Sequence, residues 1–346
     1  MKNKKILLIG PYPPPFGGVS IHIKRLKPLL AGRFDVDVID EARIKKDNIF
    51  NIRSLKIGRY LQKVLAADIV HIHSGLLSLR ILHYLAASLF FKKRIITIHG
   101  YEPGRGVVER VLDKIMLRTC NKTIFVSREI AGRFNVKQYL IKDAFLPPDL
   151  GAEEEIPAPV KNWVNEKRGL GYQVCSANAW RLDSHNNEDM YGLDLCIAAA
   201  SELKKKNEKV AFVFVVCEDT GIIKLEKYRQ LIREFGLEDC FLLFEAPLSF
   251  IRLIGDSDIV LRPTNTDGDA LTVREALFLG KTVIASDVVM RPAGTRLFKT
   301  RDAGSLARAI TDAKTGNTGN DGGMNDQAKD IASYTAYYCN NIYNLK

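Results

Sequence analysis

The stretch from Arg262 to Gly280 places acidic residues both in a polar loop and in the helix that follows the loop. Asp267 lies in a polar loop. Glu275 lies in a helix that we expect to begin near Thr272 and to end at Gly280, a residue suited to the left-handed backbone just past a helix end. The first N–H groups of a helix have no partner within it and carry partial positive charge, so they can hold a phosphate. Because carboxylates accept hydrogen bonds from hydroxyls, the stretch predicts a site for phosphate and sugar together.

Two other interpretations of the same residues stay open. Thr272 and Glu275 have the spacing of a capping box, in which the glutamate only satisfies the N-terminus of its own helix. Asp267 and Asp269, separated by Gly268, have the spacing of an Asp-x-Asp metal site. The choice depends on the elements that surround them.

Further polar residues and glycines follow expected strands in the first half of the chain. His73 and His99 each end an apolar run of strand type, and Gly17 and Gly18 separate a strand at 4–9 from a helix at 19–30. Two adjacent glycines let backbone N–H groups approach a phosphate without side-chain obstruction. The loop lacks the Gly-x-Gly-x-x-Gly fingerprint of dinucleotide binding. A Pro-rich turn and purely structural histidines are the alternatives.

Strands and helices alternate along the whole chain, which predicts doubly wound parallel sheets with ligands at the carboxyl ends of the strands. Residues 43–66 are expected to be helical in part. The expected strands are 4–9, 36–39, 68–73, 94–100, 123–127, 172–177, 210–217, 241–244, 259–261 and 283–285. The expected helices are 19–30, 78–93, 128–134, 191–204, 225–235, 272–280 and, for the most part, 328–345.

The length of 346 residues exceeds a comfortable single core and predicts two domains. Residues 147–161 contain four prolines and an acidic run, which is typical of a linker. We therefore place an N-terminal domain at 1–150 and a C-terminal domain at 165–325. Residues 316–327 have the composition of a flexible loop, and a terminal segment at 326–346 follows.

The acid at position 267, the seven residues after it and Glu275 resemble the signature of retaining, nucleotide-sugar-dependent glycosyltransferases of the GT-B fold, family 4. The family usually has Glu where this chain has Asp267, whose arm is shorter by about one methylene. The order of elements extends the resemblance over essentially the whole chain. It implies an α/β GT-B fold with two Rossmann-like domains facing across a cleft. The first would bind the acceptor, the second would bind the nucleotide sugar, and the last helix would cross back to the first.

The resemblance also implies roles for individual residues. Asp267 would hold sugar hydroxyls, Glu275 would hold the ribose hydroxyls, and His99 would line the sugar pocket. Arg181 matches the arginine of the family's Gly-Arg-Leu step and would hold the diphosphate. The expected catalytic residues are His99, Asp267 and Arg181, and the acceptor-side residues are His73 and Tyr12. The expected donor-binding residues are Gly17, Gly18, Arg181, Arg262, Asp267, Gly268, Asp269, Ala270, Leu271, Thr272 and Glu275.

One departure from the family removes a cation. Tyr191 and Gly192 stand where the family has Lys-Gly, a lysine that grips the donor diphosphate. Fixed cations stabilise the charge that develops on this leaving group. We expect Arg262, at the end of the strand that enters the donor loop, to supply part of the missing charge. A surface or structural arginine is the alternative.

The function that the resemblance implies is metal-independent hexosyl transfer with retention, without a protein nucleophile. The leaving diphosphate would take the acceptor proton, and the co-substrate would be a UDP- or GDP-linked sugar with no further cofactor. The acceptor would be a glycan or a polyprenyl-diphosphate-linked saccharide in capsule, exopolysaccharide or cell-surface glycan biosynthesis. A GT-B sugar-nucleotide epimerase and a non-catalytic glycan-binding relative remain alternatives.

Charge and cysteines indicate the partners and the compartment. Residues 1–150 contain 27 Lys and Arg against 12 Asp and Glu, which favours an anionic partner. No nucleic-acid motif accompanies this charge, so we expect an anionic membrane surface or a lipid pyrophosphate, with the helix at 78–93 either covering the sheet or lying in the interface. Six cysteines without a Cys-x-x-Cys pair and no visible secretory signal favour the cytoplasm, peripheral to the inner face of the cell membrane.

Overall fold

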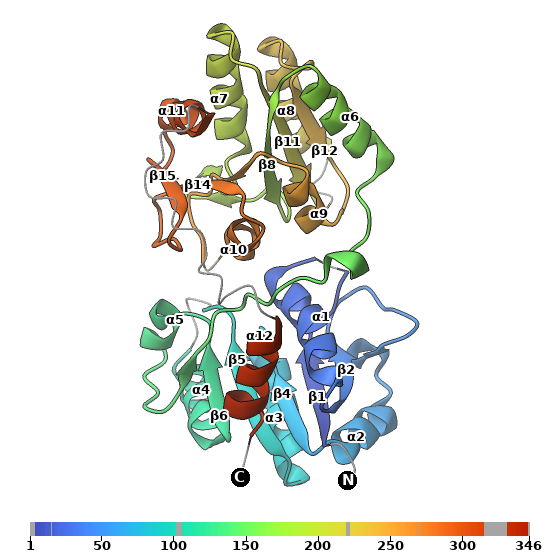
Figure 1. Cartoon of the computed structure of the whole chain (residues 1–346). Coiled ribbons are helices and arrows are strands. Elements are labelled where there is room, and N and C mark those ends of the chain that lie inside the picture. Colours follow the sequence, from blue (N-terminus) through green and yellow to red (C-terminus); the bar gives the residue numbers. More distant parts are fainter. Residues whose placement is uncertain are drawn as a thin grey trace. The chain divides into compact units, whose positions relative to one another are not determined.

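A computed structural model describes residues 4–14, 16–101, 106–218, 222–268, 270–314 and 331–344. These residues form two compact units, each built around its own parallel sheet (Figure 1). The first unit contains the chain up to Leu146 together with 331–344, and the second begins at Pro147. The expected loop at 316–327 lies outside the described residues.

The first unit has a seven-stranded parallel sheet in the order β3-β2-β1-β4-β5-β6-β7. Its strands are β1 (Lys5–Gly10), β2 (Asp35–Asp40), β3 (Phe50–Asn51), β4 (Ile69–Ile72), β5 (Lys93–Ile98), β6 (Lys122–Phe125) and β7 (Leu140–Ile141). Its helices are α1 (Gly18–Ala31), α2 (Ile57–Ala66), α3 (Leu77–Leu89), α4 (Val107–Thr119), α5 (Arg128–Gly132) and α12 (Ile331–Tyr337), which continues as a π-helical turn at Tyr338–Ile342.

Helices cover both faces of this sheet because successive side chains of a strand point to opposite faces. Ile6 and Leu8 of β1 pack against α1 and the C-terminal segment, in a cluster that includes Ile23 and Tyr343. Leu7 belongs to the cluster on the opposite face, where α2, α3 and α4 pack. A strand buried on both faces reads as the continuous apolar run that the sequence shows.

The second unit has a six-stranded parallel sheet in the order β12-β11-β8-β13-β14-β15, and a small hairpin of β9 and β10. Its strands are β8 (Gln173–Ala179), β9 (Ser184–His185), β10 (Glu188–Asp189), β11 (Val210–Val216), β12 (Phe241–Phe244), β13 (Ile259–Arg262), β14 (Thr282–Ser286) and β15 (Thr295–Phe298). Its helices are α6 (Ala158–Gly169), α7 (Leu193–Lys205), α8 (Ile222–Glu234), α9 (Phe250–Gly255), α10 (Leu271–Phe278) and α11 (Ala303–Lys314).

The predicted fold class, an α/β protein with two Rossmann-like parallel sheets, is confirmed. The expected linker at 147–161 is only partly irregular, because α6 begins at Ala158 after a 3-10 turn at Leu150–Ala152. Within the basic segment 43–66, only Ile57–Ala66 is α-helical, and Phe50–Asn51 forms an edge strand. Helices α4, α6, α9 and α11 and strand β15 were not predicted.

Candidate active site

Helix α10 presents an uncapped N-terminus at the end of the loop that follows β13. Its N-cap residue is Ala270, and no side chain caps the helix among the described residues. Thr272 is the second residue of the helix, so the capping-box interpretation of Thr272 and Glu275 is wrong. At the other end, Gly280 has φ +69°, and the N–H of Lys281 donates to the carbonyl of Ala276 at 2.9 Å, as a Schellman ending requires.

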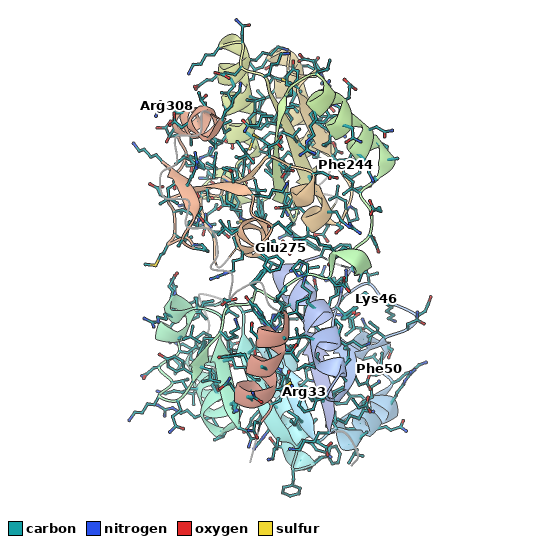
Figure 2. The ribbon with its side chains drawn as sticks, in the orientation of Figure 1. Arg33, Lys46, Phe50, Phe244, Glu275 and Arg308 are labelled. Atoms are coloured by element: carbon teal, nitrogen blue, oxygen red, sulfur yellow. The ribbon has the colours of Figure 1, made fainter. Side chains whose placement is uncertain are left out.

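Glu275 lies one turn into α10 and is buried, with 5% of its surface exposed (Figure 2). Thr272 joins the same end of the helix to the sheet, because its hydroxyl donates to Oδ1 of Asn178 on β8 at 3.4 Å. The start of α10 is therefore held beside the carboxyl end of β8. A buried carboxylate and helix N–H groups lie within one turn of each other, as the sequence predicts.

Asp267 is the centre of a buried ion-pair network. Arg262 donates from Nε to Oδ2 and from Nη2 to Oδ1, both at 2.9 Å, and Arg291 donates to Oδ2 at 2.7 Å. Thr264 and the N–H of Gly268 add bonds of 3.1 and 3.0 Å. A carboxylate has about four lone-pair positions, and five donors already point at this one. The structure therefore places Asp267 in an internal network, and not in the open position expected for an acceptor of sugar hydroxyls.

The charge of this network follows from its members. Burial alone would raise the pKa of Asp267, but Arg262 and Arg291 outweigh it and hold the pKa well below its usual range. Two guanidinium groups share this one carboxylate, which leaves positive charge beside the loop. Tyr191 stacks on this charge, since its ring centroid lies 5.6 Å from Cζ of Arg262. Tyr191 thus contacts Arg262, the arginine expected from the sequence to supply positive charge beside it.

Arg291 is the charged residue of this network that the sequence motifs do not indicate, and Thr264 is an uncharged one. Arg291 lies in the loop after β14, where its guanidinium also donates to the carbonyl oxygen and hydroxyl of Ser286, both at 3.1 Å. Strand β14 is the parallel neighbour of β13, so residues beyond both strands meet at one edge of the sheet. Applying the strand-end argument to β14 would have found Arg291.

Arg181 follows β8 at the same edge but is more open. Its side chain is 56% exposed and donates to Asp183 at 3.1 Å. Strand β8 is the other neighbour of β13, so Arg181 extends the row of arginines beyond β8, β13 and β14. Asp269 lies outside the described residues.

Gly192 has a structural reason to be glycine. Its φ is +72°, and a Cβ built on it would lie 2.2 Å from the carbonyl oxygen of Pro263. The N-terminus of α7 that it opens is already occupied, because the Asp189 carboxylate accepts from the N–H groups of Tyr191 and Leu193, both at 2.9 Å. This helix N-terminus therefore offers no phosphate site.

At Gly17 and Gly18, neither the backbone conformation nor a contact within the first unit requires a glycine. Gly17 is the N-cap of α1 with φ −102°, which any residue adopts, and its N–H donates to the Ser20 hydroxyl at 2.9 Å. A Cβ on either glycine would meet no heavy atom within 4 Å. Open space beside both glycines fits the phosphate interpretation of this loop.

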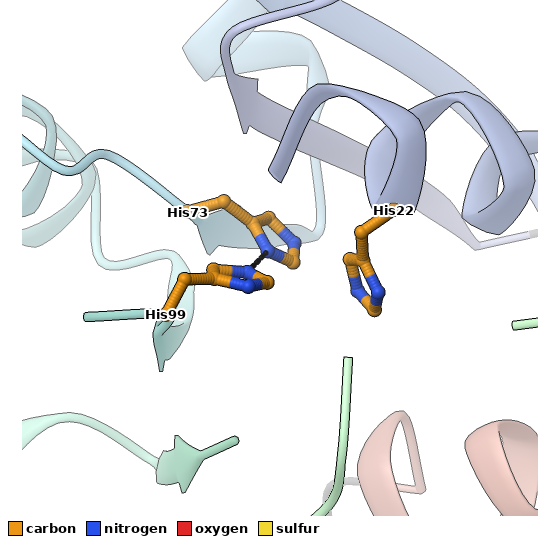
Figure 3. A group of neighbouring side chains, drawn as sticks. All are labelled: His22, His73 and His99. Atoms are coloured by element: carbon orange, nitrogen blue, oxygen red, sulfur yellow. Dashed lines mark hydrogen bonds between the residues drawn. The ribbon is translucent and has the colours of Figure 1, made fainter. Parts of the chain in front are cut away.

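Four histidines gather at the carboxyl edge of the first sheet. His73 and His99 follow β4 and β5, and Nδ1 of His73 lies 3.0 Å from Nε2 of His99 (Figure 3). His22 of α1 joins them, with ring centroids 5.2 Å from His73 and 5.1 Å from His99. The ring of His71 lies 4.0 Å from that of His73, and its nitrogens bond the hydroxyls of Tyr343 and Thr97 at 2.6 and 2.7 Å.

Burial sets the charge of this cluster. It lowers the pKa of His22 to about 4 and those of His71, His73 and His99 well below the usual value. All four rings are therefore neutral at pH 7, and each has one N–H donor and one acceptor nitrogen. His22, His73 and His99 could together hold a metal ion, since one nitrogen from each lies within 4.8 Å of the others.

The remaining acceptor-side residue, Tyr12, lies in the loop after β1. Its backbone N–H donates to Oδ1 of Asp40 at 2.8 Å, and its carbonyl accepts from Lys46 at 2.7 Å. The sequence pointed to His73, His99 and Tyr12. It did not point to His22 or His71, because His22 faces inward from a helix and His71 lies inside an apolar strand.

Comparison with known proteins shows the fold. No protein-family model and no curated protein matches this sequence. A glycosyltransferase from Rickettsia africae aligns over 100% of this chain and 95% of its own, with 18% identity and a TM-score of 0.69. HepE of Anabaena, solved with UDP and glucose, aligns over 99% and 100%, with 15% identity and a TM-score of 0.69. Sucrose-phosphate synthase of Thermosynechococcus elongatus aligns over 96% and 93%, with 15% identity and a TM-score of 0.62.

These structures share their fold with this chain along almost its whole length. Their identities are too low to transfer an activity, so the function has to be argued from the residues of the site.

Proposed function

We propose that this protein is a retaining glycosyltransferase that uses a nucleotide-diphosphate sugar. The observation that carries the proposal is the carboxyl edge of the second sheet, where Arg262 ends β13, Arg181 and Arg291 follow the neighbouring strands β8 and β14, and no described side chain caps the start of α10. A row of cations next to a helix N-terminus that no described side chain caps is complementary to a diphosphate. The same arrangement stabilises the charge that grows on a diphosphate as it leaves.

Each residue of the site then has a role. The diphosphate is held by Arg181 and by the first N–H groups of α10, and Glu275 accepts hydrogen bonds from the ribose hydroxyls. The guanidinium of Arg262 donates its Nε and Nη2 hydrogens to Asp267, so Arg262 stabilises the diphosphate through its positive charge and not through a direct hydrogen bond from these atoms. Transfer is of the family 4 type, proceeds on one face of the sugar without a protein nucleophile or a metal, and the leaving diphosphate takes the acceptor proton.

The first unit supplies groups for the sugar and the acceptor. Neutral His99 can donate or accept a hydrogen bond to a sugar hydroxyl, and the open Gly17-Gly18 loop can accept a phosphate. We further propose a UDP-linked hexose as donor, a choice supported by the UDP present in the HepE structure. The donor serves as co-substrate, so no additional cofactor is proposed.

The acceptor is proposed to be a glycan on a lipid carrier, in capsule, exopolysaccharide or other cell-surface glycan synthesis. Support comes from the apolar surface of α2, α3 and α4. Thirteen of the 22 exposed large apolar side chains among the described residues lie between Leu55 and Ile115. A groove of about 1100 Å³ between α2 and α3 is lined by Ile57, Leu82 and Leu89, among others.

Exposed basic residues lie on or next to the same helices, namely Lys56 just before α2, Arg59 on α2, and Arg110 and Arg118 on α4. Apolar side chains with a basic rim are the pattern of a protein that lies on an anionic bilayer. No helix in the described ranges has the length and apolar character needed to cross a membrane. We therefore propose a cytoplasmic protein held peripherally at the inner face of the cell membrane.

Ligand-dependent unfolding tests the donor site. Unfolding temperatures are measured with UDP, GDP, ADP, CDP and dTDP, each with and without EDTA, and with NAD as a negative control. A ligand at about 100 times its Kd adds roughly 2.7 kcal/mol to the free energy of unfolding. We expect a shift with UDP that EDTA does not change and that Glu275→Gln reduces. Glu238→Gln, which alters an exposed glutamate of the same unit, should leave the shift intact.

The other two functions give different results in the same system. An epimerase would convert the nucleotide sugar with no acceptor present, whereas a glycan-binding relative would bind donor and never turn it over. The absence of a shift with all five nucleotides would refute the donor site.

A further inference from the structure

The three histidines of the first unit that face one another are arranged as metal ligands (Figure 3). They come from three elements: His22 from α1, His73 from the end of β4 and His99 from the end of β5. His22 and His73 are buried, with 3% and 1% of their surface exposed, and His99 is half-buried. Ligands on rigid helix and strand ends are held in place before an ion arrives.

The hydrogen bond of His22 fixes which of its nitrogens is available. Nδ1 lies 2.8 Å from the carbonyl oxygen of Ala144, and a carbonyl can only accept, so Nδ1 carries the proton. The lone pair is therefore on Nε2. A histidine whose N–H donates to a backbone carbonyl is oriented as metal-binding histidines usually are.

His73 provides the second, independent observation. Its Nε2 is buried and has no hydrogen-bond partner. Its Nδ1 faces Nε2 of His99 at 3.0 Å, where only one of the two nitrogens can carry a proton. Buried polar atoms in folded proteins nearly always have a partner, so an orphaned ring nitrogen in a cluster of imidazoles points to a missing ligand.

The distances are close to those of a metal site. Two nitrogens bound to a tetrahedral zinc ion at about 2.0–2.1 Å lie roughly 3.3 Å apart. One nitrogen from each of the three rings lies within 4.8 Å of the others, and an inward movement of the rings would bring these nitrogens to that separation.

We propose that His22, His73 and His99 bind one divalent transition-metal ion, of which Zn²⁺ is the first choice. The three neutral imidazoles leave a fourth position for water or an anion. On binding, each ring presents the lone pair of one nitrogen to the ion and carries its proton on the other nitrogen, so the orphaned nitrogen of His73 can take part.

The ligand chemistry excludes Mg²⁺ and Ca²⁺, which require oxygen ligands. His71 does not join the site, because both of its nitrogens bond hydroxyl groups. The site goes beyond the proposed glycosyl transfer and does not depend on it, so its test uses no sugar nucleotide.

The test is a titration of the whole chain, freed of metal with a chelator, with Zn²⁺, Co²⁺ and Mg²⁺. We expect one Zn²⁺ or Co²⁺ per chain, the visible d–d bands of four-coordinate Co²⁺, a higher unfolding temperature with Zn²⁺ and no response to Mg²⁺. His22→Gln and His73→Gln should each weaken Zn²⁺ binding at least about tenfold, since loss of an outer partner alone costs about 10–100-fold. His185→Gln, in the second unit, should bind as the wild type does.

Each result decides the question. If the wild type shows no saturable site for Zn²⁺ or Co²⁺, the proposal is refuted. This result comes from the wild type alone, so it stands even if one of the variants does not fold. The proposal is also refuted if folded His22→Gln and His73→Gln keep wild-type affinity, or if His185→Gln loses binding to the same extent.

Discussion

Asp267 lies between Arg262 and Arg291, and its charge determines how the donor loop of the second unit is held. Replacing it with Asn would leave two arginines facing a neutral group, and removing one partner of a buried ion pair costs about 3–5 kcal/mol. We expect Asp267→Asn to lower the free energy of unfolding by an amount in this range. Denaturant unfolding measures it, with Asp239→Asn, an exposed ion pair elsewhere in the unit, as the control that loses about 1 kcal/mol or less.

The same variant gives a pH dependence of known sign. The pKa of Asp267 is depressed in the folded protein, while an unfolded chain has the usual value of about 3.9. The stabilisation is therefore complete above about pH 4 and is lost as pH falls toward the folded pKa. The difference between wild type and Asp267→Asn should stay constant from pH 7 to about 5 and shrink below about 4. A difference that grows on acidification would contradict the ion-pair network.

Gly280 and Gly192 both have positive φ, so comparing them separates the cost of a left-handed backbone from the cost of a steric clash at Cβ. Gly280 and Gly192 have φ of +69° and +72°, but a Cβ at 280 meets nothing within 4 Å, whereas one at 192 meets Pro263 at 2.2 Å. Gly280→Ala should cost about 1–2 kcal/mol, the price of left-handed backbone alone. Gly192→Ala should cost clearly more, and its Tm measured beside that of Gly280→Ala checks the order. Equal losses would mean that the loop of Pro263 moves aside freely.

At the scale of elements, the surface of α2, α3 and α4 predicts binding to anionic vesicles. Leu85 and Leu89 of α3 are 58% and 69% exposed, so replacing both with Ser removes apolar contact without disturbing the core. We expect the wild type to co-sediment with vesicles that contain phosphatidylglycerol, and the double variant to bind less. Leu170→Ser, at an exposed position of the second unit, should bind as the wild type does.

The basic rim is tested separately from the apolar surface. Each Lys or Arg near an anionic surface contributes about 1 kcal/mol, so Arg110→Glu with Arg118→Glu should reduce binding by more than tenfold. The matched control is Lys205→Glu with Lys206→Glu, which makes the same charge change at the end of α7. Equal losses in the two pairs would indicate a response to net charge. Tight self-association of the wild type without vesicles would instead indicate a second copy of the chain.

The sequence predicts helices and strands well where the apolar residues follow a single regular spacing. Strands β1, β11 and β13 are short apolar runs buried on both faces, and α10 ends at a glycine with positive φ. Helix α4 was missed because Val107, Val111 and Ile115 are exposed, so apolar residues occur on its outer side as well as its inner side. Helix α6 was missed because it begins inside a Pro-rich acidic segment. In α4 the apolar pattern reflects exposed surface residues, and in α6 the composition reflects the connecting segment. Neither pattern has the periodicity of a helix with one buried face.

At the scale of the whole molecule, contacts between distant segments are what the sequence leaves out. Arg291 meets Asp267 across 24 residues, and the Tyr343 hydroxyl meets His71 across 272. No local period encodes such a pair. The residues beyond strand ends could be predicted because parallel strands place their carboxyl ends together, whereas His22, which faces inward from α1, required the packed structure.

The C-terminal segment gives the last prediction, because it belongs to the first unit although it follows the second in sequence. Tyr338, Ile342 and Tyr343 are at most 2% exposed in the core between α1 and the sheet. Tyr343→Phe leaves Nδ1 of His71 buried without its hydroxyl partner, which should cost the first unit about 1–3 kcal/mol. Tyr139→Phe, at a tyrosine that is 43% exposed, is the control.

Tryptophan separates the two units in this experiment. The chain has two tryptophans, Trp163 and Trp180, and both lie in the second unit. Tryptophan fluorescence therefore follows the second unit alone, while circular dichroism follows both. We expect Tyr343→Phe to shift the dichroism transition to lower denaturant and to leave the fluorescence transition in place. If both transitions shift together, the two units unfold in one cooperative transition and are not independent.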